Sequence, residues 1–306
     1  MSKFSASDAA FSGFRLVREN LKTVGIWAGA MTVLSIVSNV LAIVFFGPQL
    51  EAFISYTSEN NTPDLGEMAR LMSDLAPLAL WSLPYSLLLN GIIFATLNRV
   101  VLRHEDSRFA YLRIGAAELR QAAVWLLMCL VMIGVLFLGS ALGGFLSALG
   151  GPTGAFLGLL CGLGSLGAII WLSVRLSFAS SVTFDEGKVT LFRSMPKTEG
   201  LFWPLLGAYL LAVVMSIIVI LLIWTIVSAI GLIASGDFAA TGKMMRADTS
   251  SLQAYFTPAG IVQAMFSGLI QVLTTLIVFG PAPSIYRELK ERASGLSAES
   301  SGTSGW

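Results

Sequence analysis

The chain alternates between long apolar segments without charge and short segments that carry nearly all of its charged residues. The longest uncharged segment, between Arg120 and Arg175, runs for 54 residues. A membrane-spanning helix needs about 20 apolar residues to cross a hydrocarbon layer of about 30 Å. The pattern therefore predicts two spans there, and one span in each of four shorter uncharged segments: Thr23–Leu50, Leu75–Asn98, Gly200–Gly236 and Thr249–Tyr286.

These segments predict an all-α, six-helix integral membrane bundle over residues 1–293, followed by a disordered, Ser- and Gly-rich cytoplasmic tail over residues 294–306. Gly150, Gly151 and Pro152 permit a tight reversal, so we expect the third and fourth spans to form a hairpin. The predicted spans are about Val24–Phe46, Leu75–Asn98, Gln121–Leu149, Thr153–Leu176, Leu201–Ala234 and Pro258–Phe279.

A weak threefold repeat is visible in the segments before the first, third and fifth spans. Each copy pairs an aromatic-arginine motif with a tryptophan 10 to 12 residues later: Arg15 with Trp27, Arg113 with Trp125, and Arg193 with Trp203. This pattern predicts three helical-hairpin pseudo-repeats, each opened by a short amphipathic helix that anchors in the cytoplasmic interface. The general enrichment of aromatic and basic residues at membrane borders is the alternative explanation.

Composition and charge agree with a membrane protein and indicate its orientation. Hydrophobic residues make up 55% of the chain and charged residues 12%. Of the 19 basic residues, 16 fall in the two termini and the loops after the second and fourth spans, against 11 acidic residues there. The positive-inside rule then predicts that both termini are cytoplasmic. This face suits anionic lipid headgroups, whereas a net charge of +1 disfavours nucleic acid as a partner.

No constellation of catalytic or metal-binding residues is evident, so we expect no enzyme activity, no cofactor and no metal. His104 is the only histidine, which excludes a site with several histidine ligands. Asp185 and Glu186 precede Gly187 and are interpreted as a turn rather than a catalytic pair. Because the predicted spans carry no ionisable group at depth, ion-coupled transport is disfavoured.

Uncharged polar residues recur on one face of the last span: Gln263, Ser267, Gln271 and Thr274. Their spacing of three and four residues is that of a helix face. Interhelical hydrogen bonding is the favoured interpretation. A water-lined path or a small-solute site is the alternative.

Gly154, Gly158 and Gly162 form two overlapping small-xxx-small steps on the fourth span. Glycines at this spacing allow another helix to approach closely. We expect the partner to be the third span, with a second subunit as the alternative.

The segment Val189–Val213 resembles an element of bacterial multi-pass proteins related to the glycerophosphoryl diester phosphodiesterase membrane domain. Met195 and Pro196 replace an aromatic position of that element, while six residues match it: Ser194, Gly200, Phe202, Trp203, Leu206 and Gly207. Residues 109–120 are similar to a segment of uncharacterised alphaproteobacterial membrane proteins. The resemblance implies a bacterial inner-membrane protein. It supplies no catalytic residue, because the activity of that family resides in a separate soluble barrel domain.

Together these observations predict a non-enzymatic accessory or scaffold protein that associates with lipids, with another membrane protein or with copies of itself. The main alternative is a passive carrier or channel for a neutral or lipid-like solute, lined by the polar face of the last span. A membrane enzyme that uses Asp185 and Glu186 at headgroup level is a third hypothesis.

Overall fold

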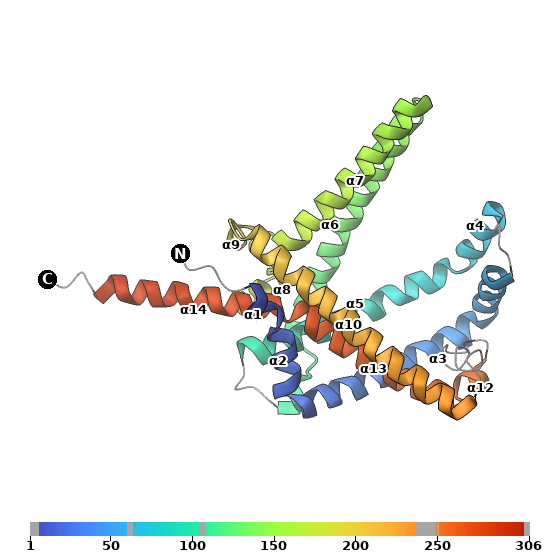
Figure 1. The fold of residues 1–306 in the computed structure, drawn as a ribbon, viewed down its shortest axis with the longest axis horizontal. Helices are drawn as coiled ribbons and strands as arrows, with labels where there is room; N and C mark the ends of the chain where they lie inside the picture. The colour runs from blue at the N-terminus through green and yellow to red at the C-terminus, as the bar shows by residue number, and fades with distance from the viewer. Residues whose placement is uncertain (1–5, 60–63, 104–107, 237–248, 250, 303–306) are drawn as a thin grey trace. The chain divides into compact units, whose positions relative to one another are not determined.

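The structure is a computed structural model that describes residues 6–59, 64–103, 108–236, 249 and 251–302. These residues form helices joined by turns, with no strand among them (Figure 1). The all-α prediction is therefore confirmed. In chain order the helices are α1 (Ala6–Ala10), α2 (Ser12–Glu19), α3 (Leu21–Glu59), α4 (Leu65–Asp74), α5 (Ala76–Leu102), the 3-10 helix η1 (Arg108–Tyr111), α6 (Ala116–Ser147), α7 (Gly151–Arg175), α8 (Ala179–Glu186), α9 (Ser194–Lys197), α10 (Phe202–Ser235), α12 (Leu252–Tyr255), α13 (Pro258–Phe279) and α14 (Pro281–Gly302).

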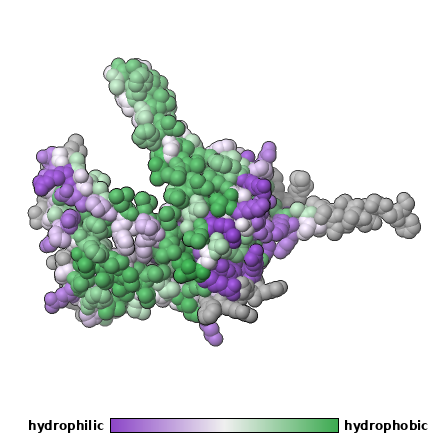
Figure 2. Space-filling model, turned by 180° about the vertical axis from the view of Figure 1, so that it is seen from behind, coloured by the Kyte–Doolittle hydropathy of each residue, from purple (hydrophilic) through white to green (hydrophobic). Residues whose placement is uncertain are grey.

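Among the described residues, six helical segments are long and apolar enough to cross a membrane, as the hydrophobic pattern predicted. Helices suit this environment because they satisfy their backbone hydrogen bonds internally. Hydrophobic residues cover much of the visible surface, including the hairpin of α6 and α7 (Figure 2). The six segments are Leu21–Thr57, Ala76–Leu102, Ala116–Ser147, Gly151–Glu186, Phe202–Ile233 and Pro258–Ser294.

Several helices extend beyond the predicted spans. α3 continues past Pro48 to Glu59, because a single proline removes one backbone donor without ending this helix. α5 and α6 extend far enough to include Arg99 and Glu118. The tail predicted to be disordered from residue 294 is instead helical to Gly302, as the end of α14. Ion pairs between residues four apart stabilise the preceding turns of this helix.

The chain divides into two compact units. Unit 1 comprises Met1–Ser12, Leu87–Leu211 and Phe279–Trp306, and unit 2 comprises Gly13–Ser86 and Ala212–Val278. Within α5 the division falls shortly after Pro84, which interrupts the backbone hydrogen bonding of that helix. Each unit has its own packing.

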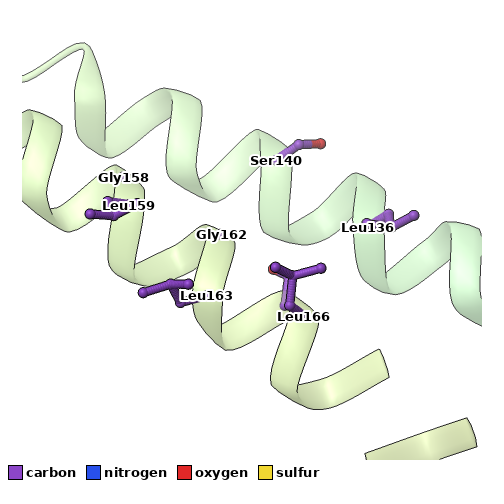
Figure 3. Close-up of a pocket in the computed structure, with 8 residues that line it drawn as sticks. Leu136, Ser140, Gly158, Leu159, Gly162, Leu163 and Leu166 are labelled. Atoms are coloured by element: carbon purple, nitrogen blue, oxygen red, sulfur yellow. The ribbon is translucent and has the colours of Figure 1, made fainter. Parts of the chain in front are cut away.

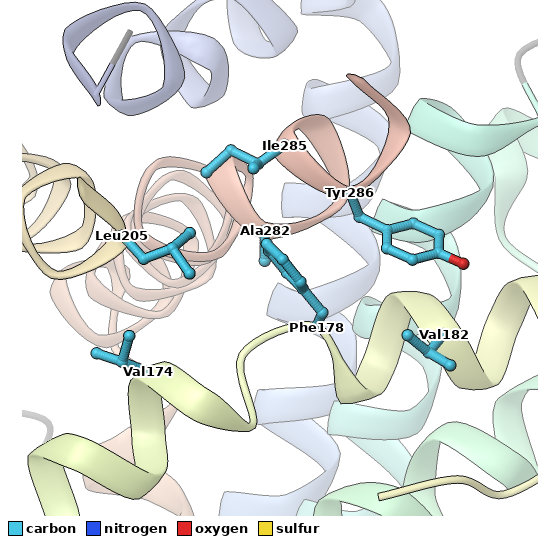
Figure 4. Close-up of a cluster of buried hydrophobic side chains, with 7 residues drawn as sticks. All are labelled: Val174, Phe178, Val182, Leu205, Ala282, Ile285 and Tyr286. Atoms are coloured by element: carbon cyan, nitrogen blue, oxygen red, sulfur yellow. The ribbon is translucent and has the colours of Figure 1, made fainter. Parts of the chain in front are cut away.

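The core of unit 1 joins α7, α8, α10 and α14 through a cluster of buried side chains (Figure 4). The Phe178 ring, in the turn between α7 and α8, is fully buried. Burial of one such side chain contributes roughly 1.5–3 kcal/mol. The cluster therefore holds α14 against helices that lie about 100 residues earlier in the chain. Its members are Val174, Phe178, Val182, Leu205, Ala282, Ile285 and Tyr286.

The α6–α7 hairpin of unit 1 runs as two antiparallel helices side by side (Figure 1). Gly150 and Gly151 form its tip with φ of 79° and 68°, a left-handed conformation that glycine adopts without strain. This agrees with the reversal predicted at this position. The hairpin thus needs almost no loop.

Unit 2 brings α13 close to α3 through small residues. A Cβ atom on Gly268 would lie 2.9 Å from the carbonyl oxygen of Ala28 and 2.9 Å from the amide nitrogen of Thr32. The Thr32 hydroxyl donates to the carbonyl of Ala28 at 2.8 Å, on its own helix. The amide of Asn39 donates to the Tyr255 hydroxyl at 3.2 Å, which ties α3 to α12.

Candidate functional site

A buried ion pair lies where α5 ends and α6 begins. Nη2 of Arg99 is 2.5 Å from Oε1 of Glu118, and the two side chains are only 6% and 5% exposed. Removing two charges from water costs free energy, which their mutual attraction offsets only when the geometry is good. The pair therefore requires the two helix ends to stay in register. α5 approaches α6 closely here, since a Cβ on Gly91 would lie 2.7 Å from the Glu118 carbonyl oxygen.

Arg99 also fixes the turn that precedes α6. Its Nη1 donates to the carbonyl oxygen of Tyr111 at 2.5 Å. Ala110 and Tyr111 have φ of 52° and 64°, a left-handed conformation that costs non-glycine residues about 1 kcal/mol each. The guanidinium thus joins a carboxylate and a strained turn, which makes it the centre of the polar contacts at this end of unit 1.

A second set of buried contacts continues from this ion pair along the helices. Nδ2 of Asn98 donates to the Ser180 hydroxyl at 2.7 Å, and that hydroxyl donates to Oε1 of Gln121 at 2.7 Å. Nε2 of Gln121 in turn donates to the backbone carbonyl of Ser180 at 2.8 Å. Asn98 and Gln121 are each 1% exposed. Amide and hydroxyl groups thereby link α5, α6 and α8.

Asp185 and Glu186 bind different partners. The Asp185 carboxylate accepts from the Tyr286 hydroxyl at 2.9 Å and from Nζ of Lys290 at 2.7 Å. Glu186 pairs with Nη1 of Arg193 at 2.6 Å. Contrary to the predicted turn, Asp185 and Glu186 both belong to the last turn of α8, and the chain reverses only at Gly187, which ends the helix with φ of 66°. Asp185 therefore fastens α14 to α8.

The C-terminal end of α7 is closed by two hydroxyl groups from a later segment. The backbone carbonyl of Arg175 accepts from Ser194 at 2.9 Å and from Thr198 at 3.2 Å. Both donors are fully buried. Carbonyls at a helix end lack partners within the helix, so these hydroxyls satisfy one of them. Gly200, with φ of 72°, then turns the chain into α10.

We name these five contact sets the polar cluster of unit 1; four of them are buried, whereas the Asp185–Lys290 pair is partly exposed. It consists of the Arg99–Glu118 ion pair, the hydrogen bond from Arg99 to the Tyr111 carbonyl, the hydrogen bonds that link Asn98, Ser180 and Gln121, the contacts of Asp185 with α14, and the hydrogen bonds of Ser194 and Thr198 to the Arg175 carbonyl. Its charged pair does not follow from the uncharged runs, because Arg99 and Glu118 lie just outside them in a segment predicted to be a loop, whereas both belong to helix ends. The available signal was Asn98 and Gln121, which are amides at the ends of apolar segments.

The predicted glycine face has two different environments. A Cβ on Gly154 would lie 2.9 Å from the Leu146 carbonyl oxygen, and one on Gly158 would lie 3.0 Å from the Gly143 carbonyl oxygen. These two glycines thus allow α7 to approach α6. Gly162 has no other group within 4 Å of its Cβ position.

Gly162 instead lines an apolar surface groove of about 490 Å³ between α6 and α7 (Figure 3). Ser140 and Ser165 are the groove's polar residues, and each donates to a backbone carbonyl of its own helix, at 3.0 and 2.8 Å. The groove therefore offers an apolar surface to any ligand. Its remaining lining residues are Leu136, Gly158, Leu159, Leu163 and Leu166.

Only half of the predicted polar face of α13 is exposed. Ser267 and Gln271 are exposed, whereas Gln263 and Thr274 are half-buried. The buried face is one residue further along; its first three residues are small, which allows α3 to approach the backbone at Gly268. It consists of Gly260, Ala264, Gly268, Val272, Leu276 and Ile277.

The predicted interface anchors occupy unlike environments. Trp27 is buried at 3% exposure, Trp125 is half-buried and Trp203 is 76% exposed. Short helical elements do precede α3, α6 and α10, namely α2, η1 and α9. Of the three arginines, Arg15 and Arg193 are exposed and Arg113 is half-buried.

Within the described part of the chain, no group of three or more His, Cys, Asp or Glu side chains is placed to hold a metal ion. His104 lies outside the described residues. No family model, curated protein or solved structure matches the chain. The resemblance proposed for Val189–Val213 therefore stays a prediction.

Proposed function

We propose that this chain is a non-enzymatic multi-pass membrane protein that serves as a scaffold for lipids or for another membrane protein. The polar cluster of unit 1 is the observation that carries this proposal. Apart from Oδ1 of Asn98, which has no hydrogen-bond partner among the described residues, its buried charged and amide groups bind one another and the backbone. As whole residues, Arg99, Glu118, Asn98 and Gln121 are each at most 5% exposed. Such groups fix helices in place and are not available to a substrate.

The α6–α7 hairpin supports the same proposal, because it presents apolar side chains outward along both helices. Phe137, Phe145 and Phe156 are 69%, 68% and 58% exposed. In a bilayer these side chains contact lipid tails or the helix of a partner. A homo-oligomer would use the same faces.

We further propose a bacterial inner-membrane location with both termini in the cytoplasm. The resemblance of Val189–Val213 to bacterial membrane proteins supports the location, and the uneven distribution of basic residues, which places 16 of 19 on the side of the termini, supports the orientation. That side also holds the polar cluster, and its surplus of basic residues suits anionic headgroups.

A passive carrier or channel is the second candidate, and the exposure of Ser267 and Gln271 favours it. Exposed amide and hydroxyl groups in a span are costly against lipid tails, so they indicate contact with water, a solute or a partner. Gln263 and Thr274 continue the same helix face.

Reconstitution into phosphatidylcholine vesicles separates the two functions. The scaffold proposal predicts that vesicles with the chain swell in glycerol, urea or erythritol no faster than protein-free vesicles. Faster swelling that is abolished by Gln263→Leu together with Gln271→Leu would establish the carrier instead. Ser82→Leu, an exposed change on another span, is the matched control. Turnover of a substrate by the purified chain would refute both.

A further inference from the structure

The segment Gly187–Trp203, which we name the α8–α10 ledge, joins the ends of two candidate membrane spans. The first ends at Glu186 and the second begins at Phe202. A short segment between two membrane-crossing helices lies at the membrane surface. The side chains that the ledge exposes therefore face the headgroup layer.

The ledge is built as a fixed platform. Ser194 and Thr198 point inward and close the end of α7, and Leu191 is buried against the core. At its start, the amide of Thr190 donates to the Thr183 hydroxyl of α8 at 3.1 Å. The inward side chains thus fix which residues must point outward.

The outward side chains combine large apolar groups with cations. Val189, Phe192 and Trp203 are 43%, 59% and 76% exposed. Exposed aromatic side chains at this depth are typical of contact with the headgroup layer. Lys188 and Lys197 are exposed beside them.

The two lysines have no ion pair with a carboxylate among the described residues. Nζ of Lys197 lies 5.3 Å from the centroid of the Tyr286 ring, a cation–π contact that orients the ammonium group. The carboxylate near it, Asp185, is already bound by Lys290 and Tyr286. Arg193 differs, because Glu186 neutralises it. Glu199 is the remaining carboxylate of the ledge.

We propose that the α8–α10 ledge binds the headgroups of anionic phospholipids, with Phe192 and Trp203 seated in the headgroup layer and Lys188 and Lys197 binding phosphate. This inference rests on the proposed lipid-associated function and names its ligand. Aromatic side chains alone would not distinguish one lipid headgroup from another. The two lysines, neither of which is in an ion pair among the described residues and one of which, Lys197, is oriented by Tyr286, provide selectivity for a negative headgroup.

The test measures lipid selectivity of the full chain in phosphatidylcholine vesicles, using trace spin-labelled phosphatidylglycerol or phosphatidylcholine. Electron paramagnetic resonance gives the relative association constant of the two probes. Wild type should prefer phosphatidylglycerol. Lys188→Gln with Lys197→Gln should reduce this preference by about fivefold or more, since each cation near the surface contributes on the order of 1 kcal/mol. Phe192→Ala with Trp203→Ala should weaken association of both probes and leave their ratio unchanged.

The control, Arg70→Gln with Arg292→Gln, removes the same charge from exposed positions on other helices and should leave the preference unchanged. A preference that survives the lysine changes, or a wild type without preference, would overturn the proposal. So would inorganic phosphate, if it suppressed the preference more than chloride at equal ionic strength, because the site would then bind soluble anions. Each variant must keep the wild-type unfolding midpoint. Vesicle swelling tests the scaffold proposal separately, so the two can fail independently.

Discussion

At the residue scale, Arg99 and Glu118 illustrate how a charge becomes part of a membrane protein's interior. Each charge is buried, and each is satisfied by the other. The energetic consequence is asymmetric: removal of one partner leaves an uncompensated buried charge, whereas removal of both leaves none.

Glu118→Gln should therefore lower the free energy of unfolding by about 3–5 kcal/mol. The paired change Arg99→Met with Glu118→Leu should recover much of this loss. Thermal unfolding in detergent measures both. Glu288→Gln, which breaks an exposed pair with Arg292, is the control and should change stability by no more than about 0.5 kcal/mol. A double variant as unstable as Glu118→Gln would show that the Arg99 bond to the Tyr111 carbonyl matters more than the ion pair.

Ser194 and Thr198 share one acceptor, so their contributions should not add. Each hydroxyl has one proton and a second acceptor nearby, the Leu191 carbonyl for Ser194 and the Met195 carbonyl for Thr198. Either hydroxyl can still donate to the Arg175 carbonyl when the other is removed. Ser194→Ala and Thr198→Val should each cost about 1 kcal/mol or less, and the double variant more than the sum, because a buried acceptor is then left unpaired. A double-mutant cycle on unfolding free energies measures this coupling. Additive effects would show that the two hydroxyls act independently.

At the element scale, the hairpin of α6 and α7 explains which of its glycines are required. Gly154 faces the backbone of α6, whereas Gly162 faces the open groove. The spacing of four residues identifies a glycine face but does not show where along α7 the helices separate. The point of separation depends on the length over which α6 and α7 remain packed against each other.

Alanine substitutions at Gly154 and Gly162 should change the free energy of unfolding in opposite directions. Gly154→Ala should destabilise the chain, because its Cβ would lie 2.9 and 3.1 Å from two backbone carbonyl oxygens of α6 that cannot easily move. Gly162→Ala should stabilise it by roughly 0.5–1 kcal/mol, because alanine favours the helix and meets no neighbour. Thermal unfolding of both variants decides the matter. Equal loss of stability at both positions would indicate that a second copy or another partner covers Gly162.

Much of this architecture follows from hydrophobic pattern alone. Uncharged runs longer than about 20 residues locate all six long helices, and Gly150-Gly151 locates the hairpin tip. The polar cluster does not follow from it, because Arg99 and Glu118 belong to helix ends that look like loop in the sequence. Their pairing depends on where α5 lies beside α6. The exposed position of Gln271 likewise depends on which face of α13 meets α3.

At the scale of the whole molecule, the proposed six crossings would place both termini on the same side of the membrane, and the positive-inside rule predicts that this side is the cytoplasm. α4, between the first two spans, should then lie on the opposite side. Phe11 lies near the N-terminus, Met72 in α4 and Ala293 in the C-terminal helix α14, and all three residues are exposed.

Single cysteines at these positions test the orientation, in a background with Cys129→Ala and Cys161→Ala. A membrane-impermeant maleimide added to intact spheroplasts should label Met72→Cys and spare Phe11→Cys and Ala293→Cys. All three should react after lysis, which controls for accessibility. The reverse labelling would invert the proposed orientation. Labelling of only one terminal position would contradict six crossings.

The separation in sequence between contacting residues also sets an order of biogenesis. The α6–α7 hairpin is complete once residue 175 has been synthesised, since each helix packs against the next one in the chain. Asp185, in contrast, must wait for Tyr286 and Lys290, 101 and 105 residues later. Contacts between distant residues close large loops and form late. Unit 1 therefore remains an open nascent intermediate until α14 leaves the ribosome and joins it.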